Sequence, residues 1–160
     1  MAVVSDIVAS WRDPRGTIRA LMAAPREERA LATLMGALIL DWIAALPYAA
    51  RQSHLDPSVP FDARVGGALM GLLFLMPPLM YGLAWLTQLI ARKLSGGHGT
   101  GLGGRMALFQ AMLATTPAVL LWGLARGLAG VGPVTAVLGL VWAAGFLWIW
   151  INMLSEVERG

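Results

Sequence analysis

The chain has 160 residues, of which 58% are hydrophobic and 13% are charged, and twelve Lys and Arg outnumber nine Asp and Glu. Soluble domains are about one quarter charged, and disordered chains are poor in apolar residues, so the composition excludes both classes. It is typical of an all-α protein of the polytopic membrane class, a bundle of transmembrane helices.

Residues 1-28 are predicted to form a cytoplasmic amphipathic segment. An apolar stripe at helical spacing reaches Trp11, and Asp13 and Pro14 are typical of the N-cap and first residue of a second helix. A broken amphipathic helix with a basic face is expected to lie in the headgroup region of a membrane. We therefore predict that Trp11, Arg15 and Arg19 contact lipid headgroups, with packing on the protein's own loops as the alternative.

Four apolar segments follow, each long enough to cross a hydrocarbon core of about 30 Å. The predicted four-helix transmembrane domain covers 29-154, with spans 29-50, 65-92, 106-128 and 130-154, and 155-160 form a cytoplasmic tail. Pro77 and Pro78 remove two backbone donors from the second span. They predict a kink or local unwinding there, and a re-entrant pair of half-helices is the alternative.

Two pairs of glycines are spaced four residues apart inside the spans. Gly67 and Gly71 lie in the second span, and Gly123 and Gly127 lie in the third. Small residues at this spacing allow membrane helices to approach closely. Both pairs are predicted to serve packing within the chain, and self-association is the alternative.

The distribution of Lys and Arg predicts the orientation. With the N-terminus inside, nine of the twelve fall in inner segments, and three fall in outer segments, namely Arg51, Arg64 and Arg126. An excess of basic residues marks the cytoplasmic side. We therefore expect a multi-pass protein of the bacterial inner (cytoplasmic) membrane with both termini in the cytoplasm.

Asp41 is the one acidic residue well inside a predicted span. A carboxylate at that depth costs several kcal/mol unless it is protonated, paired or hydrated, so it should face the bundle interior. Thr115 and Thr116 lie at about the same depth on the third span. The favoured interpretation is a polar clamp between helices, and a proton or ion site is the alternative.

Three amides, Gln88, Gln110 and Asn152, lie in the cytoplasmic halves of three different spans. Such amides most often form hydrogen bonds between membrane helices, although together they would also suit a small inward-facing polar cavity.

The sequence predicts no catalytic residue, cofactor or metal site. Cysteine is absent, which excludes disulfides and thiol chemistry, and His54 and His98 fall on opposite sides of the predicted membrane. No catalytic triad or phosphate-binding loop is recognisable. The basic residues lie at the ends of apolar runs, which indicates membrane orientation and not nucleic-acid binding.

The order of these features resembles the YIP (Ypt/Rab-interacting protein) membrane family in its short bacterial form. The resemblance is carried by residues 11–16 (WRDPRG), 55–60 (LDPSVP), 104–109 (GRMALF), 114–117 (ATTP) and the tail 148–160, which ends in SEVERG. The chain departs from the family in lacking a long acidic N-terminal region and in having four predicted spans where five are usual, so Rab binding is not carried over.

The resemblance implies a non-enzymatic membrane protein that affects membrane organisation or a partner complex. The expected partners are membrane lipids, and another membrane protein or a second copy. Two other functions are compatible with the sequence: a small proton- or ion-coupled transporter or channel that uses Asp41, and an accessory subunit of a respiratory or photosynthetic complex.

Overall fold

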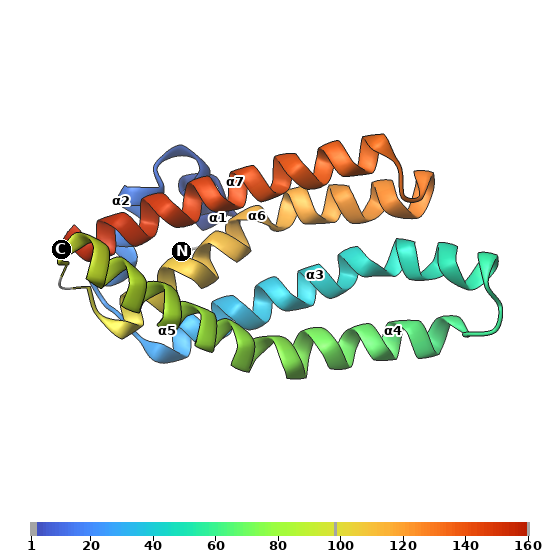
Figure 1. The fold of residues 1–160 in the computed structure, drawn as a ribbon, viewed down its shortest axis with the longest axis horizontal. Helices are drawn as coiled ribbons and strands as arrows, with labels where there is room; N and C mark the ends of the chain where they lie inside the picture. The colour runs from blue at the N-terminus through green and yellow to red at the C-terminus, as the bar shows by residue number, and fades with distance from the viewer. Residues whose placement is uncertain (1–2, 98, 160) are drawn as a thin grey trace.

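A computed structural model describes residues 3–97 and 99–159, and every regular element in these ranges is a helix (Figure 1). The helices are α1 (Val3–Arg12), α2 (Pro14–Met22), α3 (Glu27–Leu55), α4 (Phe61–Met70), the π-helix η1 (Gly71–Leu75), α5 (Met76–Ser95), α6 (Gly101–Ala129) and α7 (Pro133–Arg159). The predicted all-α membrane bundle is confirmed at this level. Residues 1, 2, 98 and 160 lie outside the description, and with them the expectation for His98.

Four helical stretches are long and apolar enough to cross a membrane, namely Glu27–Leu55, Phe61–Lys93, Gly101–Ala129 and Pro133–Arg159. Most extend past the predicted limits of 29-50, 65-92, 106-128 and 130-154, because polar residues at the ends continue the helices beyond the apolar core. The last helix takes in most of the predicted tail 155-160 and runs to Arg159.

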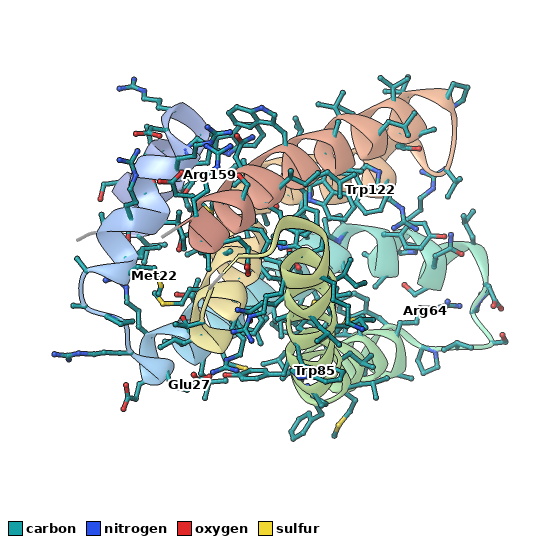
Figure 2. The ribbon with its side chains drawn as sticks, turned by 60° about the vertical axis from the view of Figure 1, so that its left-hand side comes forward. Met22, Glu27, Arg64, Trp85, Trp122 and Arg159 are labelled. Atoms are coloured by element: carbon teal, nitrogen blue, oxygen red, sulfur yellow. The ribbon has the colours of Figure 1, made fainter. Side chains whose placement is uncertain are left out.

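The four stretches form two helical hairpins that point in the same direction. Both marked chain ends lie toward one end of the bundle in Figure 1, and the short connections 56–60 and 130–132 of the hairpins lie at the opposite end. We call the first the terminal end and the second the loop end. Figure 2 likewise places Met22, Glu27 and Arg159 toward one end and Trp122 and Arg64 toward the other.

The second span is one helix with a distortion at its centre. η1 separates α4 from α5, and Figure 1 shows the two helices meeting at an angle. Pro77 and Pro78 follow directly, in the first turn of α5, where missing backbone donors are tolerated best. The chain therefore accommodates the predicted kink as a wide turn just before the prolines, and it does not fold back as a re-entrant pair.

α6 is the central helix of the bundle. It packs extensively on α3 and α7 and also touches α5, α1 and α2. The half of α6 nearer the terminal end is surrounded by other helices. Three successive residues there, Ala107, Leu108 and Phe109, are therefore fully buried. A helix that is apolar all round belongs at the centre of a membrane bundle.

The α3–α6 contact depends on the second glycine pair. A Cβ at Gly123 would overlap the backbone of Ala44, and one at Gly127 would overlap Pro47. By contrast, a Cβ at Gly67 or Gly71 would meet nothing within 4 Å. The prediction of packing within the chain is thus confirmed for the pair on α6 and is wrong for Gly67 on α4 and Gly71 on η1, which face open space.

The first two helices lie against the terminal half of α6 and α7 (Figure 1). Asp13 separates them and caps α2, because its Oδ1 accepts a hydrogen bond of 2.8 Å from the Gly16 backbone N. Ile18 and Leu21 of α2 are buried in the same core as Leu108 and Met153. The predicted amphipathic segment is therefore also a packed part of the bundle.

Candidate functional site

The polar side chains of the terminal half hold the N-terminal helices on the bundle. Ser10 on α1 is fully buried, and its Oγ accepts a 3.1 Å hydrogen bond from Gln110 Nε2 on α6. Next to it, Trp11 Nε1 donates to the backbone oxygen of Ala114 at 2.7 Å. The tryptophan ring lies against Gly145 of α7, where a Cβ would collide with it. These contacts fix the end of α1 in the groove between α6 and α7.

Helix α2 is held by its arginines. Arg15 Nε donates to Asn152 Oδ1 at 3.1 Å, and Arg19 forms a 3.1 Å ion pair with Glu156. Trp11, Arg15 and Arg19 were predicted to contact lipid headgroups, and the structure places all three in contacts with α6 or α7. The apolar stripe in the sequence did not indicate these polar partners, and contact with lipid headgroups stays a prediction.

The three predicted amides each link two elements, although Gln110 and Asn152 bind the N-terminal helices and not another span. Gln110 holds α1, Asn152 holds α2, and Gln88 Nε2 on α5 donates to the backbone oxygen of Thr100. Gln88 and Gln110 are buried. They bind three different partners and do not line one common cavity.

Asp41 and the two threonines do not form the predicted clamp. Thr115 Oγ1 donates to the backbone oxygens of Ala111 and Met112, and Thr116 Oγ1 donates to that of Leu113. The hydroxyl of a threonine in a helix can donate to a backbone oxygen of the preceding turn, and both threonines form this local hydrogen bond here. Within residues 3–97 and 99–159, the structure shows no hydrogen bond or ion pair for the half-buried Asp41 side chain.

A charged cluster that the sequence did not indicate ties α3, α5 and α6 together at the terminal end. Arg105 Nη2 pairs with Glu27 Oε2 at 2.7 Å, and Tyr81 OH donates to Glu27 Oε1 at 3.1 Å. The Arg105 guanidinium also lies 5.7 Å from the centre of the Tyr81 ring. The three residues are far apart in the chain, and no local pattern in the sequence indicates that they meet.

The glycine-rich connection between α5 and α6 wraps around the end of α7. Glu158 is 7% exposed, and its Oε2 accepts a 3.4 Å hydrogen bond from the Gly99 backbone N. Side chains at Gly97 or Gly99 would collide with Glu158. The glycines thus serve close packing around a carboxylate.

The loop end carries a stacked arginine. The Arg126 guanidinium lies 4.1 Å from the centre of the Tyr48 ring and 4.8 Å from that of the Trp122 ring. Arg51 Nη1 donates to the backbone oxygen of Leu128 at 3.0 Å and so caps the end of α6. Both arginines therefore join α3 to α6 at the loop end.

The turn 56–60 has its own small network. Asp56 accepts hydrogen bonds from the Ser58 hydroxyl, from the Ser58 backbone N at 3.1 Å and from Arg64 Nη2 at 3.2 Å. The hydrogen bonds from Ser58 and then the nearby Arg64 hold the pKa of Asp56 below its ordinary value of 3.8.

We expect the turn 56–60 to loosen at acid pH. Since folding lowers the pKa of Asp56, its stabilising contribution is complete above pH 3.8 and is lost as the pH falls through the lowered pKa. Hydrogen exchange at the Ser58 amide should therefore be protected above pH 3.8 and accelerate below it, beyond the intrinsic pH dependence. An Asp56→Asn variant should lack this transition, and an unchanged transition in that variant would contradict the assignment.

Most of these polar groups make contacts within the bundle. Apart from Asp41, the polar side chains named above bind backbone or neighbouring helices, and the described residues hold no cluster of three His, Asp or Glu that would bind a metal ion. No protein-family model, curated protein or solved structure matches the chain.

Proposed function

We propose that this chain is a non-enzymatic, multi-pass protein of the bacterial cytoplasmic membrane that acts through its lateral helix surfaces on lipids or on another membrane protein. One observation carries the proposal. Each span contains an apolar segment of 18 residues. Of these residues, 61% are buried in Gly101–Ala129, but only 11% in Pro133–Arg159 and 6% in Phe61–Lys93. Such surfaces need an apolar cover.

The open surfaces carry large side chains. On α5, Trp85 is 66% exposed, and on α7, Leu140 is 70% exposed. They form long apolar faces on the second and fourth spans, which a lipid bilayer or a membrane partner would cover. The glycine contacts at Gly123 and Gly127 close the α3–α6 interface.

The resemblance to the YIP family supports a role in membrane organisation or in a partner complex, without Rab binding. The excess of basic residues in the predicted inner segments supports cytoplasmic termini. The role in membrane organisation or in a partner complex and the cytoplasmic location of the termini are both parts of the proposal.

The orientation can be tested directly because the natural chain has no cysteine. Ser58→Cys places one thiol at the loop end, and Ala24→Cys places one in the exposed connection between α2 and α3. A membrane-impermeant maleimide should label Ser58→Cys in intact cells and Ala24→Cys only after lysis. The reverse pattern would overturn the proposed orientation.

The lateral surface can be tested by photo-crosslinking in native membranes. A crosslinking amino acid at Trp85 should give lipid adducts or one discrete protein adduct, because that side chain lies on the open face of α5. The same group at Val59, in the loop-end turn, serves as the control and should give neither. A chain that stays dissolved without detergent would overturn the proposal.

The unpaired Asp41 favours a second candidate, a proton- or ion-coupled transporter. If Asp41 carries transport, Asp41→Asn should abolish flux in proteoliposomes while the bundle keeps its thermal stability, because no described partner is lost. Equal flux in the variant and the wild type would remove this candidate.

A further inference from the structure

We propose that a groove at the loop end, between the last turns of α3 and α6, binds the phosphate group of an anionic phospholipid. The groove has a volume of about 430 Å³. Arg51 and His54 of α3 form its polar side, and Pro47, Leu55 and Leu128 form apolar walls. The inference rests on the membrane placement proposed above, and it names the kind of lipid that one lateral surface would hold.

The groove carries a positive charge that no acidic residue balances. Among the residues that the structure describes, the ion pairs do not include Arg51 or His54. By contrast, Arg64, the arginine of the other hairpin at the loop end, is paired with Asp56 at 3.2 Å. A groove with a cation and apolar walls suits a molecule that has a negative group and a hydrocarbon part.

The guanidinium of Arg51 keeps donors available for a ligand. Its Nη1 donates to the backbone oxygen of Leu128 at 3.0 Å, which leaves Nε and Nη2 for other partners. Gly130 lies beside these two atoms, and a Cβ at this glycine would come to 3.0 Å from both. Because Gly130 has no side chain, there is room next to this edge of the guanidinium, which can bind a phosphate through paired hydrogen bonds.

The depth of Arg51 matches the layer in which lipid phosphates lie. Arg105 belongs to the charged cluster of the terminal end, and Leu128 is the residue that Arg51 caps. They are 23 residues apart on α6, or about 35 Å along the axis. A hydrocarbon core measures about 30 Å. Arg51 therefore lies just outside the far end of the core, among headgroups.

A row of exposed leucines leads from the groove into the hydrocarbon core. Leu121, Leu124 and Leu128 are all exposed, and their spacing places them on one side of α6. An acyl chain would lie along this row while its phosphate contacts Arg51 and His54. Phosphatidylglycerol has a net negative charge and therefore fits the groove better than the zwitterionic phosphatidylcholine or phosphatidylethanolamine.

The test is site-specific photo-crosslinking of the full-length protein in vesicles with equal parts of these three lipids, followed by mass spectrometry of the lipid adducts. A crosslinking amino acid at Leu124 samples the leucine row and lies outside the groove lining. Phosphatidylglycerol should be enriched about fivefold in its adducts, the factor expected for one basic side chain beside an anionic lipid. The same group at Leu140, on the exposed face of α7, should give adducts in proportion to the vesicle composition.

Three variants that carry the Leu124 probe assign the enrichment to the groove. Arg51→Gln, whose amide can still donate to the Leu128 oxygen, should bring the adducts down to the vesicle composition. His54→Ala removes an exposed side chain and should lower the enrichment about twofold. Arg64→Gln is the matched loop-end control and should leave the enrichment unchanged, because Arg64 is already paired.

Adducts at Leu124 that match the vesicle composition, or an enrichment that survives in Arg51→Gln, would overturn the site. If glycerol 3-phosphate at the same concentration as the lipid removed the enrichment, the ligand would be a soluble phosphate ester and the lipid assignment would be wrong. Circular dichroism establishes that each variant keeps its helices. Lipid adducts at Trp85 and Leu124 without enrichment would reject this site and leave the proposed function standing.

Discussion

Gly123→Ala should lower the free energy of unfolding by about 1–3 kcal/mol, since overpacking a close contact has this magnitude. The new methyl group would overlap the Ala44 backbone, which cannot rotate away as a side chain can. The two helices that form the largest contact in the bundle would have to separate. Reversible unfolding in detergent by added dodecyl sulfate measures the change.

Gly67→Ala is the matched control, because it adds the same methyl group to the other glycine pair. That group would meet nothing within 4 Å, so the free energy of unfolding should stay within about 0.5 kcal/mol of the wild type. If the two variants lose equal stability, the assignment of α6 as the glycine-dependent contact is wrong.

Trp11→Ala should release the N-terminal helices from the groove between α6 and α7. The variant loses the hydrogen bond to the Ala114 oxygen and the ring contact with Gly145. For a side chain that is 40% exposed, the loss amounts to about 2 kcal/mol of docking free energy. Trypsin cleavage after Arg12, Arg15 or Arg19 in detergent should accelerate about 30-fold, because cleavage follows the open population.

Trp85→Ala removes an equally large side chain from the exposed face of α5 and should leave the rate of N-terminal cleavage unchanged. Equal protection of the N-terminal helices in Trp11→Ala and the wild type would show that the arginine contacts alone hold them.

The apolar spans were predictable because hydropathy is a local property of the sequence. The number of apolar spans, the distortion near Pro77 and Pro78, and the helix start at Asp13 all follow from a few neighbouring residues. The ends of the spans were predicted too short, since polar residues such as Glu27 extend helices without changing their apolar core.

The polar contacts were less predictable because they join distant segments. Depth along a span suggested that Thr115 and Asp41 would meet, but depth says nothing of which way a hydroxyl turns. The glycine pairs show the same limit. Gly123 and Gly67 belong to the same sequence pattern. Whether such a glycine forms a close helix contact depends on whether another helix lies beside it.

The docking of the N-terminal helices sets an order on biosynthesis. Trp11 leaves the ribosome 103 residues before Ala114, and Arg15 leaves it 137 residues before Asn152. At a synthesis rate of about 5–20 residues per second, this gap lasts roughly 5 to 30 s. During that time the first helices have no groove to enter, so the nascent chain must shelter their apolar stripe elsewhere until the last span arrives.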